Sequence, residues 1–232
     1  PKLGINTSMH KINAKAFRNP KLVQIFDRFA TYNGSSPYQT PGIMSMIPHL
    51  EMQLGTFTPK GGMKEIALSL YALALKKGVT FKFNEEVTKI IIDKKAITGL
   101  ISTKGNYEAS VVVSNSDIFT SYSSLLKDDL SPKKIVQQER SSSAIIFYWG
   151  IRKQFPELDL HNILFSSDYE TEFDTLFNQQ LISSDPTIYI NISSKEEQAD
   201  APAGSENWFV MINTPANYNQ DWDALIVLLV NV

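Results

Sequence analysis

A double glycine between two regular segments is the part of this sequence best suited to hold a small molecule. The run Pro59-Lys60-Gly61-Gly62-Met63 follows strand-like residues 55–58 and leads into a helix-like run from Met63 to Lys77. Two adjacent glycines let the backbone turn sharply and approach another group closely, because no Cβ stands in the way. The first turn of the helix then offers free N–H groups, which favour an anion. The sequence therefore predicts a backbone-lined binding site at Gly61 and Gly62.

Composition excludes several other kinds of chemistry. The sequence has no cysteine, so disulfides and thiolate metal sites are excluded. His10, His49 and His161 lie far apart and show no metal-ligand spacing. With 22 basic and 24 acidic residues, the charges nearly balance, and no broad field would attract nucleic acid. We therefore expect neither a metal site nor a nucleic-acid partner.

The first 53 residues are predicted to be helical. Ser8 is a candidate cap for one helix, and Asn19-Pro20 fits a cap followed by proline at the first helical position of the next. Asp27 and Arg28 are interpreted as surface or inter-helix charges. The apolar residues of this second helix recur at helical spacing and predict one stripe: Leu22, Ile25, Phe26 and Phe29.

A third helix is predicted from about Thr40 to Gln53, and its residues are apolar nearly all round. Such a helix is either buried in a core or faces an apolar ligand. The sequence leaves both interpretations open, and a plain core helix is the more ordinary of the two.

The middle of the chain combines a helix with strands. We expect a helix over Ile66–Lys77, a strand over Val79–Phe83, a hairpin of Val87–Asp93 with Ala96–Thr103, and a further strand over Tyr107–Ser114. This order predicts an α/β unit that carries an inserted antiparallel hairpin.

The remainder is predicted to be mostly β-structure. The expected strands form an antiparallel sheet against which the N-terminal helices pack, so the fold class is α+β. A short helix is expected over 169–181, and a closing apolar run at 225–230 is expected to be a strand or a helix. The predicted strands are 143–151, 163–165, 187–192 and 208–212.

Together these segments resemble the phytoene desaturase, or carotenoid desaturase, family of flavin-dependent oxidoreductases, which share an amine-oxidase-like architecture. The order and spacing of the matching passages make the resemblance specific, and it covers nearly the whole chain. The passages are Phe29–Tyr38, Gly55–Met63, Asn84–Val87, Val112–Asp117, Phe147–Gly150, Leu160–Asn162 and Ala201–Gly204.

The resemblance has two departures. The family begins with a strand and a Gly-x-Gly-x-x-Gly turn that holds the FAD pyrophosphate, and it ends with a second FAD-contacting segment. Neither occurs in this sequence. The resemblance therefore implies an internal fragment of an FAD enzyme that binds FAD weakly or not at all and does not catalyse on its own. It also implies a substrate-binding domain over 1–53 and 119–232, with a partial FAD-binding domain over 54–118.

The resemblance also implies roles for particular residues. Gly61 and Gly62 would lie close to the flavin, Met63 would open the next helix, and Val87 would touch the adenine through its backbone. The alternatives are glycines that serve packing alone and a valine that belongs to the hairpin core. His161 is a weak candidate for taking up a proton, and a structural hydrogen bond is the alternative.

A linear carotenoid such as phytoene offers no hydrogen-bonding handle, so its affinity must come from apolar area. Met44, Ile47, Phe147 and Trp149 would line such a tunnel, or they would form the domain core. The resemblance implies a cytoplasmic location with the parent enzyme touching the membrane surface, because linear carotenes reside in bilayers. A non-catalytic isoprenoid- or lipid-binding module, and a related polyene saturase or isomerase, are the alternative functions. The sequence does not indicate the oligomeric state.

Overall fold

The computed structural model describes residues 4–126, 134, 137–217 and 219–229. The chain divides into two compact units, Pro1–Ala67 with Arg140–Val232, and Leu68–Glu139. These units are defined by spatial contacts. The predicted division into a substrate-binding domain and a partial FAD-binding domain concerns function, and it stays a prediction.

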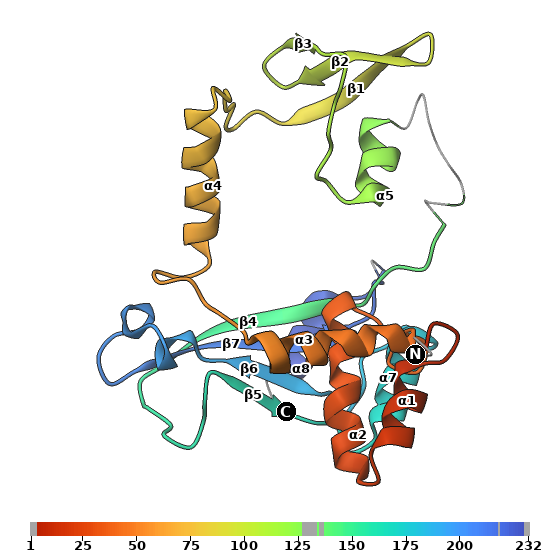
Figure 1. The fold of residues 1–232 in the computed structure, drawn as a ribbon, viewed down its shortest axis with the longest axis vertical. Helices are drawn as coiled ribbons and strands as arrows, with labels where there is room; N and C mark the ends of the chain where they lie inside the picture. The colour runs from red at the N-terminus through yellow and green to blue at the C-terminus, as the bar shows by residue number, and fades with distance from the viewer. Residues whose placement is uncertain (1–3, 127–133, 135–136, 218, 230–232) are drawn as a thin grey trace. The chain divides into compact units, whose positions relative to one another are not determined.

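The first unit is built on an antiparallel sheet of four strands in the order β4-β7-β6-β5 (Figure 1). In that order the strands are Ser143–Ile151, Glu206–Thr214, Ile188–Asn191 and His161–Leu164. Helix α7, Tyr169–Phe177, follows β5 and begins where Asp168 accepts a hydrogen bond from the Thr171 N–H at 3.0 Å. The antiparallel sheet predicted from the sequence is confirmed.

The core of this unit lies against one face of the sheet. Its buried centre is Ile190, Ile192 and Val210. The partly buried side chains packed against this centre are Phe147, Leu158, Ile188 and Trp208. These residues come from three strands and two connecting loops, so the core depends on the pairing of the strands.

A buried ion pair lies at the end of the same sheet. Lys195 closes the short helix η4, Ser193–Lys195, which η5, Gln198–Asp200, follows. The Nζ of Lys195 lies 2.7 Å from Oε1 of Glu206, whose side chain is only 3% exposed. Glu206 also accepts hydrogen bonds from the Phe155 N–H at 2.9 Å and from Trp208 Nε1 at 2.8 Å. Every donor around this carboxylate comes from a different segment, so Glu206 ties the loops to β7.

The N-terminal helices start as the sequence predicts. Helix α1, Met9–Ala16, is capped by Ser8, and α2, Pro20–Asp27, is capped by Asn19, whose side chain accepts from the Lys21 N–H at 2.9 Å. The 3₁₀ helix η1, Arg28–Asn33, continues directly from α2.

The predicted apolar stripe of α2 is wrong in two of its members. Leu22 and Ile25 are 42% and 45% exposed, whereas Val23 and Asp27 are buried. Asp27 faces inward because its carboxylate meets polar groups of α1, so of the two interpretations of this charge the inter-helix one is confirmed.

The third predicted helix begins later than expected. Residues Gly42–Ser45 form the 3₁₀ helix η2, and α3 runs over Met46–Leu54. Pro48 has no N–H to donate, and a helix tolerates such a residue only in its first turn, where the N–H groups have no intrahelical partner. The position of Pro48 therefore explains why α3 starts at Met46.

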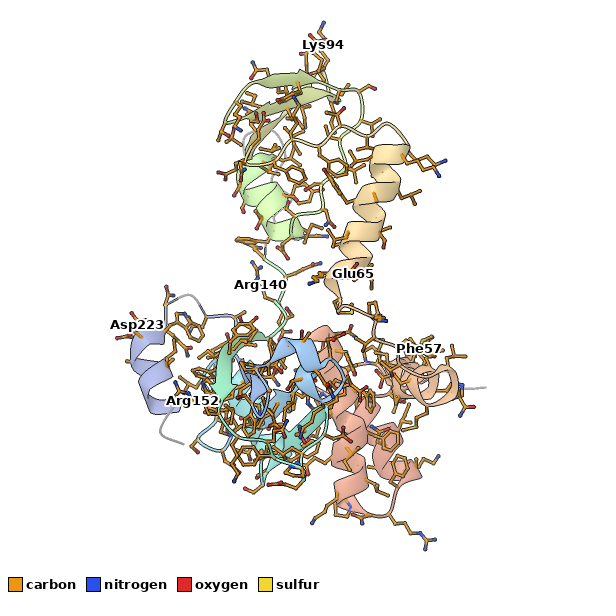
Figure 2. All side chains as sticks on the ribbon, turned by 90° about the vertical axis from the view of Figure 1, so that its left-hand side faces the viewer. Phe57, Glu65, Lys94, Arg140, Arg152 and Asp223 are labelled. Atoms are coloured by element: carbon orange, nitrogen blue, oxygen red, sulfur yellow. The ribbon has the colours of Figure 1, made fainter. Side chains whose placement is uncertain are left out.

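The second unit contains a three-stranded antiparallel sheet, β1-β2-β3, formed by Val87–Asp93, Ala96–Ser102 and Asn106–Glu108. The predicted hairpin is confirmed, and its tip is formed by the exposed Lys95 and by Lys94, which Figure 2 labels. Most of α4, Lys64–Lys76, belongs to this unit, as do α5, Ile118–Thr120, and the π-helical turn η3, Ser121–Leu125. Helices and antiparallel sheets together confirm the α+β class.

One predicted strand is absent, and another is shorter than expected. Val79–Phe83 pairs with no strand in the described part of the chain, and the strand predicted over Tyr107–Ser114 ends at Glu108. The rings of Phe81 and Phe83 instead lie 4.5 and 5.9 Å from that of Tyr71 on α4. Val111 and Val113 remain 74% and 89% exposed. Strand-forming residues are not enough for a strand, because a ladder needs a neighbour to exchange hydrogen bonds with.

The apolar run at 225–230 continues a helix, α8, Trp222–Leu229, and Val230 lies outside the described residues. Within the described residues, no helix is both long and apolar enough to cross a bilayer.

Candidate functional site

The Gly61-Gly62 turn presents bare backbone at the start of α4. The φ angles of the two glycines are +85° and +88°, and the N–H of Gly62 donates to the Pro59 carbonyl at 2.9 Å. A Cβ built on Gly62 would meet no atom within 4 Å. The turn therefore combines a conformation that favours glycine with open space beside it, which suits the close approach of a flat ring.

The charge near this turn argues against a phosphate as its ligand. Glu65 lies in the first turn of α4 (Figure 2), and a Cβ on Gly61 would be 3.1 Å from its Cγ. A carboxylate at a helix start already occupies the positive end of the helix dipole. The anion preference predicted from the sequence is thus weakened, and a neutral group fits this turn better. Met63, the third residue predicted here, is 66% exposed.

Val87 lies in the second unit, at the first residue of β1, and lines a cavity of about 630 Å³. Apolar side chains of β1 and β2 form one part of the lining, and the segment 112–116 forms another. In that segment, Ser114 and Ser116 share hydrogen bonds with Ser121 at 3.0 and 2.7 Å. The structure thus brings Val87 and the Val-Val-Ser-Asn passage, two separate motifs of the sequence, to one cavity.

The predicted substrate residues of β4 lie on the core side of the sheet. Side chains alternate along a strand, so Phe147 and Trp149 share one face, with ring centroids 5.6 Å apart. Phe147 packs against Ile190, Ile192 and Val210. Met44 in η2 and Ile47 in α3 are half-buried. Their assignment to a substrate tunnel stays a prediction, and for Phe147 the packing supports the alternative role in the core.

The opposite face of the same sheet is apolar and open, and reasoning from the sequence missed it. Tyr148 is 79% exposed there, Ile146 41% and Ile163 38%. The register pairs Tyr148 with Phe209 and Ile146 with Met211, which places these side chains together. Strand alternation predicts two faces, but only the packing shows which of them is covered.

His161 lies on this open face as well. Its Nδ1 is 2.8 Å from the hydroxyl of Tyr189 and 3.3 Å from Nδ2 of Asn191. Burial raises the pKa of Tyr189, while a hydrogen bond from Asn191 opposes the shift. The structural hydrogen bond considered for His161 is therefore present, and a role in proton uptake stays a prediction.

A second histidine, His10, has a partner that the sequence does not reveal. Its Nδ1 lies 2.7 Å from Oδ2 of Asp27, and Oδ1 of Asp27 accepts from Nδ2 of Asn13 at 2.8 Å. Burial raises the pKa of Asp27, although the hydrogen bonds from His10 and Asn13 act against that rise. One feature of the sequence could have indicated that Asp27 faces inward. Asp27 follows Val23 by four residues, which places both on one face of α2.

The sequence matches a known protein family and several known proteins. The family model described as flavin containing amine oxidoreductase matches residues 2–182. A 1-hydroxycarotenoid 3,4-desaturase from Flavobacterium sp. (strain P99-3) is 56% identical over 227 residues, which are 98% of this chain and 46% of that protein. A phytoene desaturase from Fusarium fujikuroi is 31% identical over 202 residues, 86% of this chain and 35% of that protein.

Solved structures agree on the fold. An oxidoreductase from Methanosarcina mazei has a TM-score of 0.71 at 16% identity, and the match covers 97% of this chain and 51% of that one. The chain spans less than half the length of the two desaturases. The family match extends over most of the sequence, from the N-terminal helices through α7, and includes the Gly61-Gly62 turn and Val87. This chain therefore belongs to the flavin-containing amine oxidoreductase family.

Proposed function

We propose that the chain is the substrate-binding part, together with a section of the flavin-binding part, of an FAD-dependent oxidoreductase that introduces double bonds into a linear carotenoid. The observation that carries the proposal is the 56% identity to a 1-hydroxycarotenoid 3,4-desaturase over nearly the whole chain. The division proposed is 1–53 with 119–232 for substrate and 54–118 for the flavin. The chain alone is proposed not to catalyse.

The residues present fit FAD at two places. The open space beside Gly62 admits a flat ring, and the cavity at Val87 offers apolar walls with serine hydroxyls at one side, which suits an adenosine. When bound, the flavin would accept the hydride that no amino-acid side chain can accept. The proposed roles of this chain are a bare backbone at Gly61-Gly62, with Met63 at the helix start, and a backbone contact at Val87.

The substrate would be held by apolar area, at about 25 cal/mol per Å² removed from water. Met44 and Ile47 are proposed for the tunnel together with Ile146 and Tyr148 of the open face. Phe147 and Trp149 lie on the other face of the sheet, so they are assigned to the core side instead. His161 and Tyr189 form the polar spot beside that face. The face would exclude water from the reacting carbons and orient the chain of the substrate. Contact of the parent enzyme with a membrane surface is proposed because such substrates dissolve in bilayers.

Relatives leave more than one reaction open on this fold. A 4,4'-diapolycopene oxygenase from Methylomonas sp is 34% identical over 190 residues. Oxygenation adds an oxygen atom to the carotenoid, whereas desaturation removes two hydrogens, so product analysis separates them. Desaturation is favoured here because the desaturase is much the more similar of the two.

The test is a chimera in which this chain replaces the matching 227 residues of the Flavobacterium desaturase. The remaining segments then come from a protein already named as a desaturase. The matched control is the same host with those residues deleted. We expect the chimera to desaturate a hydroxylated linear carotenoid and the deletion control not to.

A further inference from the structure

A cavity of about 520 Å³ lies between α1, α2 and the start of α7, all within the first unit. Neither the family match nor the proposed flavin and substrate sites assign it a role. One part of its lining is apolar and includes Ala14, Phe17 and Val23. The other part is polar and is centred on His10 and Asp27. The cavity therefore suits a molecule with an apolar body and one polar group.

The imidazole of His10 is held in a fixed orientation. Asp27, which is 1% exposed, binds Nδ1 at 2.7 Å, and Asn13 holds the other carboxylate oxygen. The ring of Tyr38 lies 4.7 Å from that of His10 and restricts it from the side. Within the described residues, the hydrogen bond of the His10 ring is made at Nδ1, so Nε2 remains available to a ligand of the cavity that His10 lines.

The available atom and the surrounding charges select the polar group. Nε2 accepts a hydrogen bond when the ring is neutral and donates one when it is protonated, and a hydroxyl satisfies both states. Asp27, Asp168 and Glu170 line the cavity and would repel a phosphate or a carboxylate. The basic side chains Arg18 and His10 also line the cavity, and they would weaken its attraction for a cation. A neutral hydroxyl is the group that this environment penalises least.

We propose that this cavity binds the hydroxyl-bearing end of a branched isoprenoid, with its hydroxyl group on Nε2 of His10 and its methyl groups against Phe17 and Val23. The choice of an isoprenoid rests on the proposed function. The hydroxyl follows from the lining of the cavity. His10 would then determine whether a hydroxylated substrate is preferred over the plain hydrocarbon.

The experiment titrates the 232-residue chain with a branched tertiary alcohol of isoprenoid type, the alkane of the same carbon skeleton, and a straight-chain alcohol of equal length. We expect the branched alcohol to bind saturably and about three- to tenfold more tightly than the alkane, as one added hydrogen bond would give. Equal affinity for alcohol and alkane would overturn the hydroxyl site. Equal affinity for the straight and branched alcohols would overturn the isoprenoid assignment.

Variants and a spectroscopic readout separate His10 from other causes. His10→Phe should lose the preference for the alcohol and keep affinity for the alkane, whereas the matched control His49→Phe, at an exposed position of α3, should retain the preference. If His10→Phe does not fold, the alcohol is added to the unaltered chain and the NMR signals of the histidine rings are followed. Only the signals of His10 should shift. A shift confined to His161, or none, would refute the proposal. Alcohol binding can succeed while the desaturase chimera fails, and the reverse, so the two proposals are tested separately.

Discussion

Phe147 and Tyr148 are neighbours in β4, yet their side chains lie on opposite faces of the sheet. Phe147 packs against the buried Ile190, Ile192 and Val210, whereas Tyr148 is 79% exposed. This relationship divides the sheet into a face that stabilises the fold and a face available to a ligand.

Replacing each of these two rings should separate stability from function. Phe147→Ala should lower the free energy of unfolding of the chain by about 3 kcal/mol, because it leaves a cavity in the core. Tyr148→Ala should change that free energy by about 1 kcal/mol or less, because the side chain is exposed and its ring contacts that of Phe209 across the strands. In the chimera, Tyr148→Ala should raise KM for the carotenoid. Chemical denaturation and steady-state kinetics check the pair, and an unchanged KM would argue against the open face as substrate wall.

The Gly61-Gly62 turn gives a prediction with a close control. Gly62 and Gly78 have φ angles of +88° and +82°, and a Cβ on either would meet no atom within 4 Å. Substitution by alanine should therefore impose a similar backbone strain at both, about 1 kcal/mol. A Cβ at 62 would also occupy the space proposed for the flavin. In the chimera, Gly62→Ala should reduce the flavin content while Gly78→Ala leaves it unchanged, and equal losses would contradict the assignment.

The buried Glu206 predicts a pH dependence of stability. Burial alone would raise its pKa, but Lys195, the Phe155 N–H and Trp208 together lower the pKa below its ordinary value of 4.5. The ionised form is thus favoured by folding, so its contribution is present above pH 4.5 and is lost as the pH falls through the lowered pKa.

Glu206→Gln should therefore cost about 2 kcal/mol near neutral pH, because the amide nitrogen cannot accept a hydrogen bond from the buried donors. The difference between the variant and the unaltered chain should shrink in acid. Urea unfolding of both proteins at a series of pH values measures this difference in the free energy of unfolding. A difference that stays constant down to strong acid would show that Glu206 is not the group responsible.

The hairpin tip offers a stabilising change. Lys94 and Lys95 have φ angles of +47° and +69°, a conformation that lysine adopts at a cost. Replacing Lys94 by Asn and Lys95 by Gly should raise the free energy of unfolding by about 1 kcal/mol, because Asn and Gly adopt positive φ angles readily. Ala-Ala is the control, since it removes the charge repulsion without relieving the backbone. A gain for Ala-Ala equal to that for Asn-Gly would assign the effect to charge.

Local features of this fold could be predicted from the sequence, and features that depend on a partner could not. Asn19-Pro20 begins α2 as predicted, because a cap needs only the residues next to it. The sequence leaves open whether Asp27 is a surface or an inter-helix charge, and its burial depends on His10 and Asn13 of another helix, which hydrogen-bond its carboxylate.

The strands show the same limit. Val79–Phe83 has strand-forming residues but no pairing strand in the described part of the chain. The same distinction applies to the candidate site. The motif at Gly61-Gly62 can be found in the sequence, whereas the open face at Tyr148 depends on which side of the sheet the core covers.

We propose that this chain supplies the substrate wall and part of the flavin site of a carotenoid desaturase. The most direct measurement uses the purified chimera, its visible flavin absorbance and the mass of the carotenoid after incubation. We expect bound flavin and a product lighter by two hydrogens in the chimera, and neither of them in the deletion control. A folded chimera that binds no flavin, or that binds flavin and leaves the carotenoid unchanged, would contradict it.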